Sequence, residues 1–202
     1  TAAGNYTLTQ PTGLTANITP ATLTVTGETA ANKVYNGNTT ATINTANAAL
    51  SGVVQGDTVS LSTSGVTGTF ASGNAATGVA VTVAGNTISG SSAGNYTLTQ
   101  PTGLAANITP ATLTVTGQTA ANKVYDGSTT ASLSGGQLSG VIGSDNVTLT
   151  QAGTFASKNV ATGIAVTAND SLGGTAAGNY TLTQPTGLAA NITPATLTVV
   201  GE

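Results

Sequence analysis

The stretch Asn-Tyr-Thr-Leu-Thr-Gln-Pro-Thr-Gly-Leu occupies residues 95–104, and it recurs at residues 5–14 and 179–188. Each copy leads into Asn-Ile-Thr-Pro-Ala-Thr-Leu-Thr-Val, which begins at Asn17, Asn107 and Asn191. The copies follow one another after 90 and 84 residues, which is longer than one coil of a solenoid. A repeat of this length is typical of a string of small domains.

The spacing predicts two complete repeats, at residues 20–109 and 110–193, which we call the first and the second repeat. Residues 1–19 then correspond to the C-terminal strands of a preceding repeat, and residues 194–202 to the first strand of a following one. The sequence contains no methionine, not even at position 1, so we expect it to be a piece of a longer protein.

The composition excludes several classes of partner. Charged residues make up 4% of the chain, against about 25% in ordinary globular domains. The net charge of −3 excludes the basic surface that nucleic acids or anionic membranes require. No apolar run approaches the roughly 20 residues of a membrane-spanning helix, so we expect no membrane insertion. The absence of cysteine excludes a disulfide framework.

Alternation of apolar and polar residues predicts short strands throughout. In residues 21–26, Leu23 and Val25 share one face and threonines occupy the other. Residues 39–43, 67–70, 78–83 and 96–99 are predicted as further strands, whereas residues 46–50 fit a helical turn or a loop. About seven short strands per repeat, separated by turn residues such as Asn36-Gly37, favour an all-β fold. We expect tandem antiparallel β-sandwiches of Ig-like plan.

The two repeats differ little, and the differences bear on charge. Residues 18–35 and 108–125 are identical except for Glu28 against Gln118. Asn36 in the first repeat stands where the second has Asp126. Neither charge is therefore required by the common design. Asn17, Asn107 and Asn191 precede the Ile-Thr-Pro junction, where we expect side-chain to backbone hydrogen bonds to fix the chain path.

Residues suited to catalysis or metal binding are scarce. General acid–base and nucleophilic chemistry usually needs histidine, cysteine or paired carboxylates, and the chain has no His or Cys and six acids in all. Asp57 and Asp145 are single acids in glycine-rich turns, where backbone hydrogen bonding is expected rather than calcium binding. We predict no enzyme activity, no metal and no cofactor.

One combination of residues suggests a covalent cross-link. Each repeat has a lysine, a shared aspartate and strand asparagines, which are the components of an intramolecular isopeptide bond. Such a bond requires a desolvated lysine whose pKa is lowered by burial. The alternative is a solvated lysine with its stem on a neighbouring tyrosine. The candidates are Lys33, Asp57 and Asn95 in the first repeat, and Lys123, Asp145 and Asn179 in the second.

The second repeat contains a series of spaced motifs. They are Lys123-Val124-Tyr125-Asp126-Gly127, Thr129-Thr130-Ala131, Gly153-Thr154-Phe155, Asn179-Tyr180-Thr181-Leu182 and Ile192-Thr193-Pro194-Ala195. Together they resemble the YDG repeat of bacterial surface and secreted proteins of the filamentous-haemagglutinin adhesin type. The resemblance covers essentially the whole chain and implies a tandem extracellular β-domain, without implying a ligand.

These observations predict a structural stalk or scaffold at the bacterial cell surface or in an extracellular fibre. The short proline-containing junction should restrict motion between neighbouring repeats of the same chain, which are the expected partners. One alternative is a filament subunit that self-associates into fibres by strand pairing between chains. Another is a module that binds a host or matrix glycan or protein, with Tyr35 and Tyr125 as candidate contact residues.

Overall fold

The computed structural model describes residues 2–201 and confirms an all-β chain. Within these residues the helical elements are three short 3-10 helices, η1 (Ala2–Asn5), η2 (Ala93–Asn95) and η3 (Ala177–Asn179). The strands that end at or before Thr109 are β1 (Ala21–Thr26), β2 (Thr29–Ala30), β3 (Lys33–Val34), β4 (Thr40–Ala41), β5 (Ile43–Asn44), β6 (Ala49–Ser51), β7 (Ser60–Ser62), β8 (Thr67–Phe70), β9 (Ala76–Ala84), β10 (Thr87–Ser89), β11 (Tyr96–Thr99) and β12 (Leu104–Thr109).

The later strands follow the same order along the chain. They are β13 (Ala111–Thr116), β14 (Thr119–Ala120), β15 (Lys123–Val124), β16 (Thr130–Ala131), β17 (Leu133–Ser134), β18 (Gln137–Ser139), β19 (Thr148–Thr150), β20 (Gly153–Phe155), β21 (Ala161–Ala168), β22 (Ser171–Gly173), β23 (Tyr180–Thr183) and β24 (Leu188–Thr193).

The chain divides into two compact units, each made of separate segments. Unit 1 comprises Thr1–Glu28, Thr45–Val66 and Ala84–Pro101. Unit 2 comprises Thr29–Asn44, Thr67–Val83 and Thr102–Glu202.

Unit 1 contains a three-stranded sheet of order β11-β1-β6 and the antiparallel pair β7–β10. Strand β1 pairs parallel with β11, where Leu23 lies opposite Leu98, and antiparallel with β6, where Val25 lies opposite Leu50. Leu23 and Val25 are buried, whereas the threonines between them are exposed. The period-two pattern of the sequence therefore places one face of β1 in the core.

Unit 2 contains two five-stranded sheets of equivalent order, β3-β12-β9-β8-β4 and β15-β24-β21-β20-β16. A three-stranded sheet, β18-β13-β23, and the pairs β2–β5, β14–β17 and β19–β22 complete it. In both large sheets the last strand of the repeat pairs parallel with the strand that begins at the lysine. Lys33 lies opposite Ile108, and Lys123 lies opposite Ile192.

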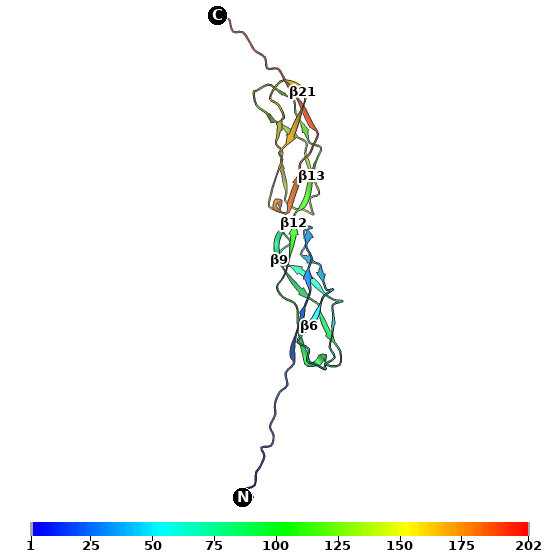
Figure 1. The fold of residues 1–202 in the computed structure, drawn as a ribbon. Helices are drawn as coiled ribbons and strands as arrows, with labels where there is room; N and C mark the ends of the chain where they lie inside the picture. Colours follow the sequence, from blue (N-terminus) through cyan, green and yellow to red (C-terminus); the bar gives the residue numbers. More distant parts are fainter. Residues whose placement is uncertain (1, 202) are drawn as a thin grey trace. The chain divides into compact units, whose positions relative to one another are not determined.

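A single residue, Pro110, connects β12 to β13. Both strands are labelled on the ribbon in Figure 1. Close to Pro110, β12 has a register shift between Ala106 and Ile108. Here Asn107 Oδ1 accepts a hydrogen bond from the backbone N–H of Gly78 at 2.8 Å. Asn191 makes the equivalent contact with Gly163, which confirms the predicted side-chain to backbone bonds at these two positions.

The core of the second repeat surrounds Phe155, which is 2% exposed and packs beneath aliphatic side chains of β16, β21 and β24. The other buried members of this cluster are Ala131, Ile164, Val166, Ala190 and Ile192. Phe70 of the first repeat is likewise 2% exposed, and the tyrosines Tyr35, Tyr96 and Tyr180 are also buried.

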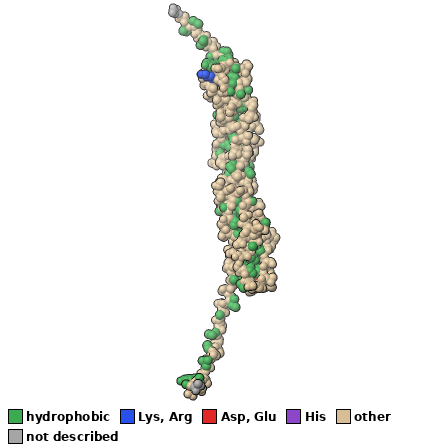
Figure 2. Space-filling model, viewed as in Figure 1, with side chains coloured by type: hydrophobic (Ala, Val, Ile, Leu, Met, Phe, Trp, Pro, Cys, Tyr) green, Lys and Arg blue, Asp and Glu red, His purple; other side chains and the backbone are tan. Residues whose placement is uncertain are grey.

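Uncharged polar side chains and backbone dominate the face of the molecule shown in Figure 2, and hydrophobic side chains are scattered over it. Charged side chains are almost absent from this face, as the composition requires. Among the described residues, no helix has the length and apolar character needed to cross a membrane.

The sheets correct three details of the expected fold. Pairing is mixed, because β1–β11, β3–β12, β13–β23 and β15–β24 are parallel, so a purely antiparallel arrangement is wrong. Alternation fixes which face is buried and carries no information on strand direction. The predicted strand at residues 39–43 is split into β4 and β5, and residues 49–51 form β6 where a helical turn or loop was expected. Strands β8, β9 and β11 confirm the strands predicted near them.

Replacing Phe155 by alanine should lower the free energy of unfolding by about 3–5 kcal/mol, because the cavity cannot be refilled from aliphatic neighbours. Val160, which is 47% exposed, offers a matched control. Its replacement by alanine should change the free energy by less than about 0.5 kcal/mol. Denaturant unfolding followed by circular dichroism measures both, and equal losses would contradict the assignment of the core.

Candidate functional site

Asp145 joins tyrosines from both repeats within unit 2. Its Oδ2 atom accepts a hydrogen bond from the hydroxyl of Tyr180 at 2.5 Å and from that of Tyr35 at 2.8 Å. Tyr180 begins β23, Tyr35 follows β3, and Asp145 lies in the loop between β18 and β19. The two rings meet edge to face, with centroids 5.4 Å apart and an interplanar angle of 77°. We call these three residues the junction cluster.

Backbone and amide contacts extend the junction cluster. The Tyr180 hydroxyl accepts a hydrogen bond from the backbone N–H of Ile142 at 3.0 Å, so its donor is directed to Asp145. Asn179 Oδ1 accepts from the N–H of Ala75 at 2.8 Å, and Asn179 Nδ2 donates to Asn74 Oδ1 at 3.3 Å. Both loops of the first repeat that lie in unit 2, around residues 35 and 74, therefore contact the second repeat.

The carboxylate of Asp145 affects the titration of both tyrosines. Its hydrogen bond is the main reason why the pKa of Tyr35 is raised, with burial second. For Tyr180, burial is the larger cause of the raised pKa and the hydrogen bond to Asp145 follows. Both hydroxyls therefore keep their protons, and their role as donors, beyond the pH at which a free tyrosine ionises.

Unit 1 contains the counterpart of the contact between Tyr180 and Asp145. The Tyr96 hydroxyl donates to Asp57 Oδ2 and accepts from the backbone N–H of Val54 at 3.0 Å. The hydrogen bond to Asp57 is also the main reason why the pKa of Tyr96 is raised. Asn95, the counterpart of Asn179, is exposed. The aspartate–tyrosine pair is thus common to both repeats.

The second tyrosine of the junction cluster has a counterpart in different surroundings. Tyr35 is 6% exposed, whereas Tyr125, at the equivalent position of the second repeat, is 40% exposed. The residues around the two tyrosines are nearly the same in sequence, so the difference reflects the contact that Tyr35 makes with Asp145 and Tyr180.

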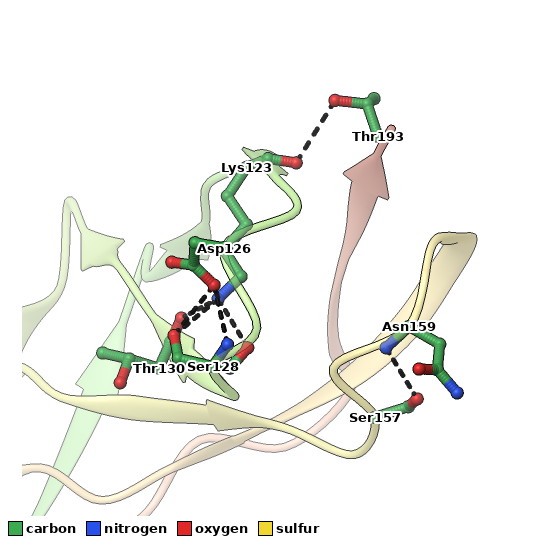
Figure 3. A network of polar contacts seen from close by, with 7 residues as sticks. All are labelled: Lys123, Asp126, Ser128, Thr130, Ser157, Asn159 and Thr193. Carbon is green, nitrogen blue, oxygen red and sulfur yellow. Dashed lines mark hydrogen bonds and ion pairs between the residues drawn. The ribbon is translucent and has the colours of Figure 1, made fainter. Parts of the chain in front are cut away.

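The lysine of each repeat closes the loop that follows it. Lys123 Nζ donates to Asp126 Oδ1 and to the carbonyl oxygen of Ser128, both at 2.8 Å, and to the Thr130 carbonyl at 3.2 Å (Figure 3). It lies 5.5 Å from the ring centroid of Phe155. The hydrogen bond from Lys123 is the main reason why the pKa of Asp126 is lowered to about 2, and the hydrogen bonds from Ser128 follow.

The first repeat makes the same closure with an amide in place of the acid. Lys33 Nζ donates to Asn36 Oδ1 at 2.9 Å, to the Asn38 carbonyl at 2.6 Å and to the Thr40 carbonyl at 3.2 Å. Desolvation by burial lowers the pKa of Lys33. The Nζ atom of Lys33 lies over the ring of Phe70, 5.3 Å from the ring centroid.

The hydrogen bonds of the isopeptide candidates involve other partners. In unit 2, Lys123 is hydrogen-bonded to its own loop, Asp145 to tyrosines, and Asn179 to residues 74 and 75. Lys33 contacts its own loop in the same way, and Asp57 contacts Tyr96. The isopeptide bond remains a prediction. Of the candidate contact tyrosines, Tyr35 is buried in the junction cluster and Tyr125 is accessible.

A second polar feature, a buried acid–amide pair, escaped the sequence analysis. In unit 1, Asn86 Nδ2 donates to Glu28 Oε2 at 3.2 Å. In unit 2, Gln118 Nε2 donates to Asp170 Oδ1 at 3.0 Å. All four side chains are at least 92% buried, with exposures of 5% to 8%. The acid and the amide have exchanged places between the repeats, so each repeat retains one carboxylate and one amide.

The sequence does contain a signal for this pair. Position 28 changes from Glu to Gln at 118, and Asn86 changes to Asp170, which is the compensating exchange. Considered alone, the first change suggests that charge is dispensable. Considered together, the two changes show that one buried carboxylate facing one amide is retained. Among the described residues, no group of three or more His, Cys, Asp or Glu side chains could hold a metal ion.

Comparison with known proteins identifies the repeated unit. A family model, that of the YDG domain, matches residues 19–103 and again residues 109–187. No curated protein and no solved structure matches the chain.

Replacing Gln118 by glutamate should destabilise the protein by about 2–4 kcal/mol, because it places a second buried carboxylate beside Asp170 and removes a donor. Adding Asp170→Asn recreates the pairing of Glu28 with Asn86 and should recover most of the loss. Chemical unfolding of both variants measures this. A double variant no more stable than Gln118→Glu alone would contradict the pairing.

The junction cluster should weaken at alkaline pH. Unfolded tyrosine ionises near pH 10, and the folded-state pKa of Tyr35 and Tyr180 lies above that value. Their stabilisation is therefore complete below about pH 10 and is lost as the pH rises through the folded-state pKa. Unfolding free energies between about pH 8 and 11 should fall less steeply for Tyr35→Phe than for the wild type. Identical slopes would show that Tyr35 does not donate to a carboxylate.

Proposed function

Because the chain belongs to the YDG domain family, we propose that it is a structural stalk or scaffold segment of a bacterial cell-surface or secreted adhesin, or of an extracellular fibre. Its repeats hold position and spacing and carry out no catalysis. Residues 20–109 and 110–193 act as the repeating bodies of a tandem array, and each has the plan of an Ig-like sandwich with mixed strand pairing.

The junction cluster is the observation that supports this proposal. Asp145 accepts hydrogen bonds from a tyrosine of its own repeat and from one of the repeat before it. A single residue, Pro110, separates the last strand of the first repeat from the first strand of the second. Proline fixes its own φ angle, and so short a connection leaves little freedom. Both features favour a fixed orientation of consecutive repeats.

The use of charge also supports a structural role. The shared lysines close loops of their own repeats, and the shared aspartates accept hydrogen bonds from tyrosines. The hydrogen bonds of these charged groups therefore stabilise the fold of the protein. The same cluster could be formed with further repeats in a longer array. Tyr125 would then donate to the aspartate of the next repeat, and Asp57, paired with Tyr96, would accept from the tyrosine of the repeat before it.

The orientation of consecutive repeats can be tested by residual dipolar couplings of the whole chain. The amides of β12, β24 and β13 should fit one alignment tensor in the wild type. In Asp145→Ala, which removes the acceptor of both tyrosines, the strands of the two repeats should need separate tensors. Asp126→Asn, which alters an exposed loop away from the junction cluster, should retain a single tensor. Separate tensors in the wild type would contradict a fixed array.

The alternative function is that of a filament subunit, which the low charge of the chain favours. Residues 5–14 repeat the sequence that forms β11, yet Tyr6 is 82% and Leu8 84% exposed, whereas Tyr96 is 7% exposed. Leu197 and Val199, in a segment equivalent to β13, are 95% and 98% exposed. In the filament alternative, these segments pair with strands of another copy of the chain and not with the rest of their own repeats.

Sedimentation velocity over a range of concentrations tests the filament alternative. Strand exchange predicts species that grow with concentration, and Leu197→Asp with Val199→Asp should suppress them by placing charges in the new sheet. A wild-type chain that remains a monomer at every concentration would contradict it.

A further inference from the structure

The first repeat contains the one Asn-Gly dipeptide of the chain, Asn36-Gly37, at the position of Asp126-Gly127 in the second repeat. Both residues of the dipeptide are exposed. Gly37 has a positive φ of 76° and no side chain to shield its backbone nitrogen. An asparagine followed by glycine is therefore presented to solvent in the loop that Lys33 closes.

We propose that Asn36 is a self-deamidation site, and that Lys33 captures the carboxylate formed there as Lys123 captures Asp126. The reaction converts the first repeat to the loop chemistry of the second without any enzyme. It adds a modification that is independent of the proposed scaffold function.

The reaction needs only water beyond the groups present. The backbone nitrogen of Gly37 forms a bond to Cγ of Asn36 and gives its proton to solvent. The bond from Cγ to Nδ2 breaks, and this nitrogen leaves as ammonia after it takes up a proton from solvent. One water molecule then opens the five-membered imide. Cleavage at Cγ gives aspartate, and cleavage at the main-chain carbonyl carbon gives isoaspartate.

The ammonium group of Lys33 is placed to favour the first step. It lies 2.9 Å from Oδ1 of Asn36, and the backbone N–H of Asn38 donates to the same oxygen at 3.3 Å. Negative charge develops on this oxygen when the Gly37 nitrogen adds to Cγ. A cation and a donor already directed at the oxygen stabilise that charge.

The second repeat shows how the aspartate product would be held. Asp126 Oδ1 lies 2.8 Å from Lys123 Nζ and accepts from the backbone N–H of Ser128 at 2.9 Å. Lys33 and the N–H of Asn38 occupy the corresponding places around Asn36. An oxygen in place of the amide nitrogen therefore requires no rearrangement of the loop, and it replaces an ion–dipole contact by an ion pair.

Incubation of the folded chain at mildly alkaline pH tests the proposal. Digestion after lysine and tandem mass spectrometry locate the change from amide to acid and separate the aspartate and isoaspartate products. Asn36 should convert at least about tenfold faster than Asn38, a ratio that corresponds to about 1.4 kcal/mol in the barrier. An amide at position 36 that persists while the denatured chain deamidates there would overturn the proposal.

Two variants test the part played by Lys33. In Asn36→Asp, the new carboxyl group should titrate with a midpoint close to that of Asp126, whose pKa is about 2, as followed by carbon NMR. In Lys33→Met, which retains an apolar stem above Phe70, the conversion of Asn36 should slow. Adding Lys33→Met to Asn36→Asp should return the titration towards the ordinary range. An ordinary midpoint with Lys33 present, or faster conversion without it, would refute the assigned role.

Discussion

The hydrogen bonds that Asp145 accepts from Tyr180 and Tyr35 are the contact on which the relation between the repeats depends. The bond to Tyr180 belongs to the repeat itself, since Asp57 and Tyr96 form the same pair in unit 1. The bond from Tyr35 comes from the other repeat. A carboxylate oxygen carries two lone pairs, so Oδ2 of Asp145 can accept from Tyr180 of its own repeat and also from Tyr35 of the other repeat. A single acid therefore contacts donors from both repeats.

Charge is scarce in this chain, and the lysines and acids that the two repeats share make local contacts. The lysines satisfy carbonyl and side-chain oxygens of one loop above an aromatic ring. The buried acid of each repeat is matched with one amide, and the two positions exchange roles between repeats. A buried carboxylate lowers stability unless it is hydrogen-bonded. Because the acid and the amide are exchanged together, the carboxylate has an amide donor in both repeats. The lysine likewise donates to an oxygen that either an amide or a carboxylate can supply, as Asn36 does for Lys33 and Asp126 does for Lys123.

Much of the fold could be predicted from local pattern, whereas the contacts of the site could not. Alternation in residues 21–26 identified the buried face of β1, and the repeated stretch identified β11 and β23. Strand direction was missed, because parallel and antiparallel strands buried on one face share that pattern. Asp145 was interpreted as a turn residue because its partners lie 110 and 35 positions away in sequence. The exchange of Asn86 for Asp170 was visible in the sequence, but only the structure shows that it compensates for that of Glu28 for Gln118.

The most direct test of this account is a double-mutant cycle between Tyr35→Phe and Asp145→Asn, measured by chemical unfolding of the whole chain. Each change removes one side of the hydrogen bond and keeps the size of the side chain. The account predicts that the two losses are not additive, with a coupling of at least about 1 kcal/mol. A coupling below about 0.3 kcal/mol would mean that Tyr35 and Asp145 act independently, and the repeats would then lack the link proposed here.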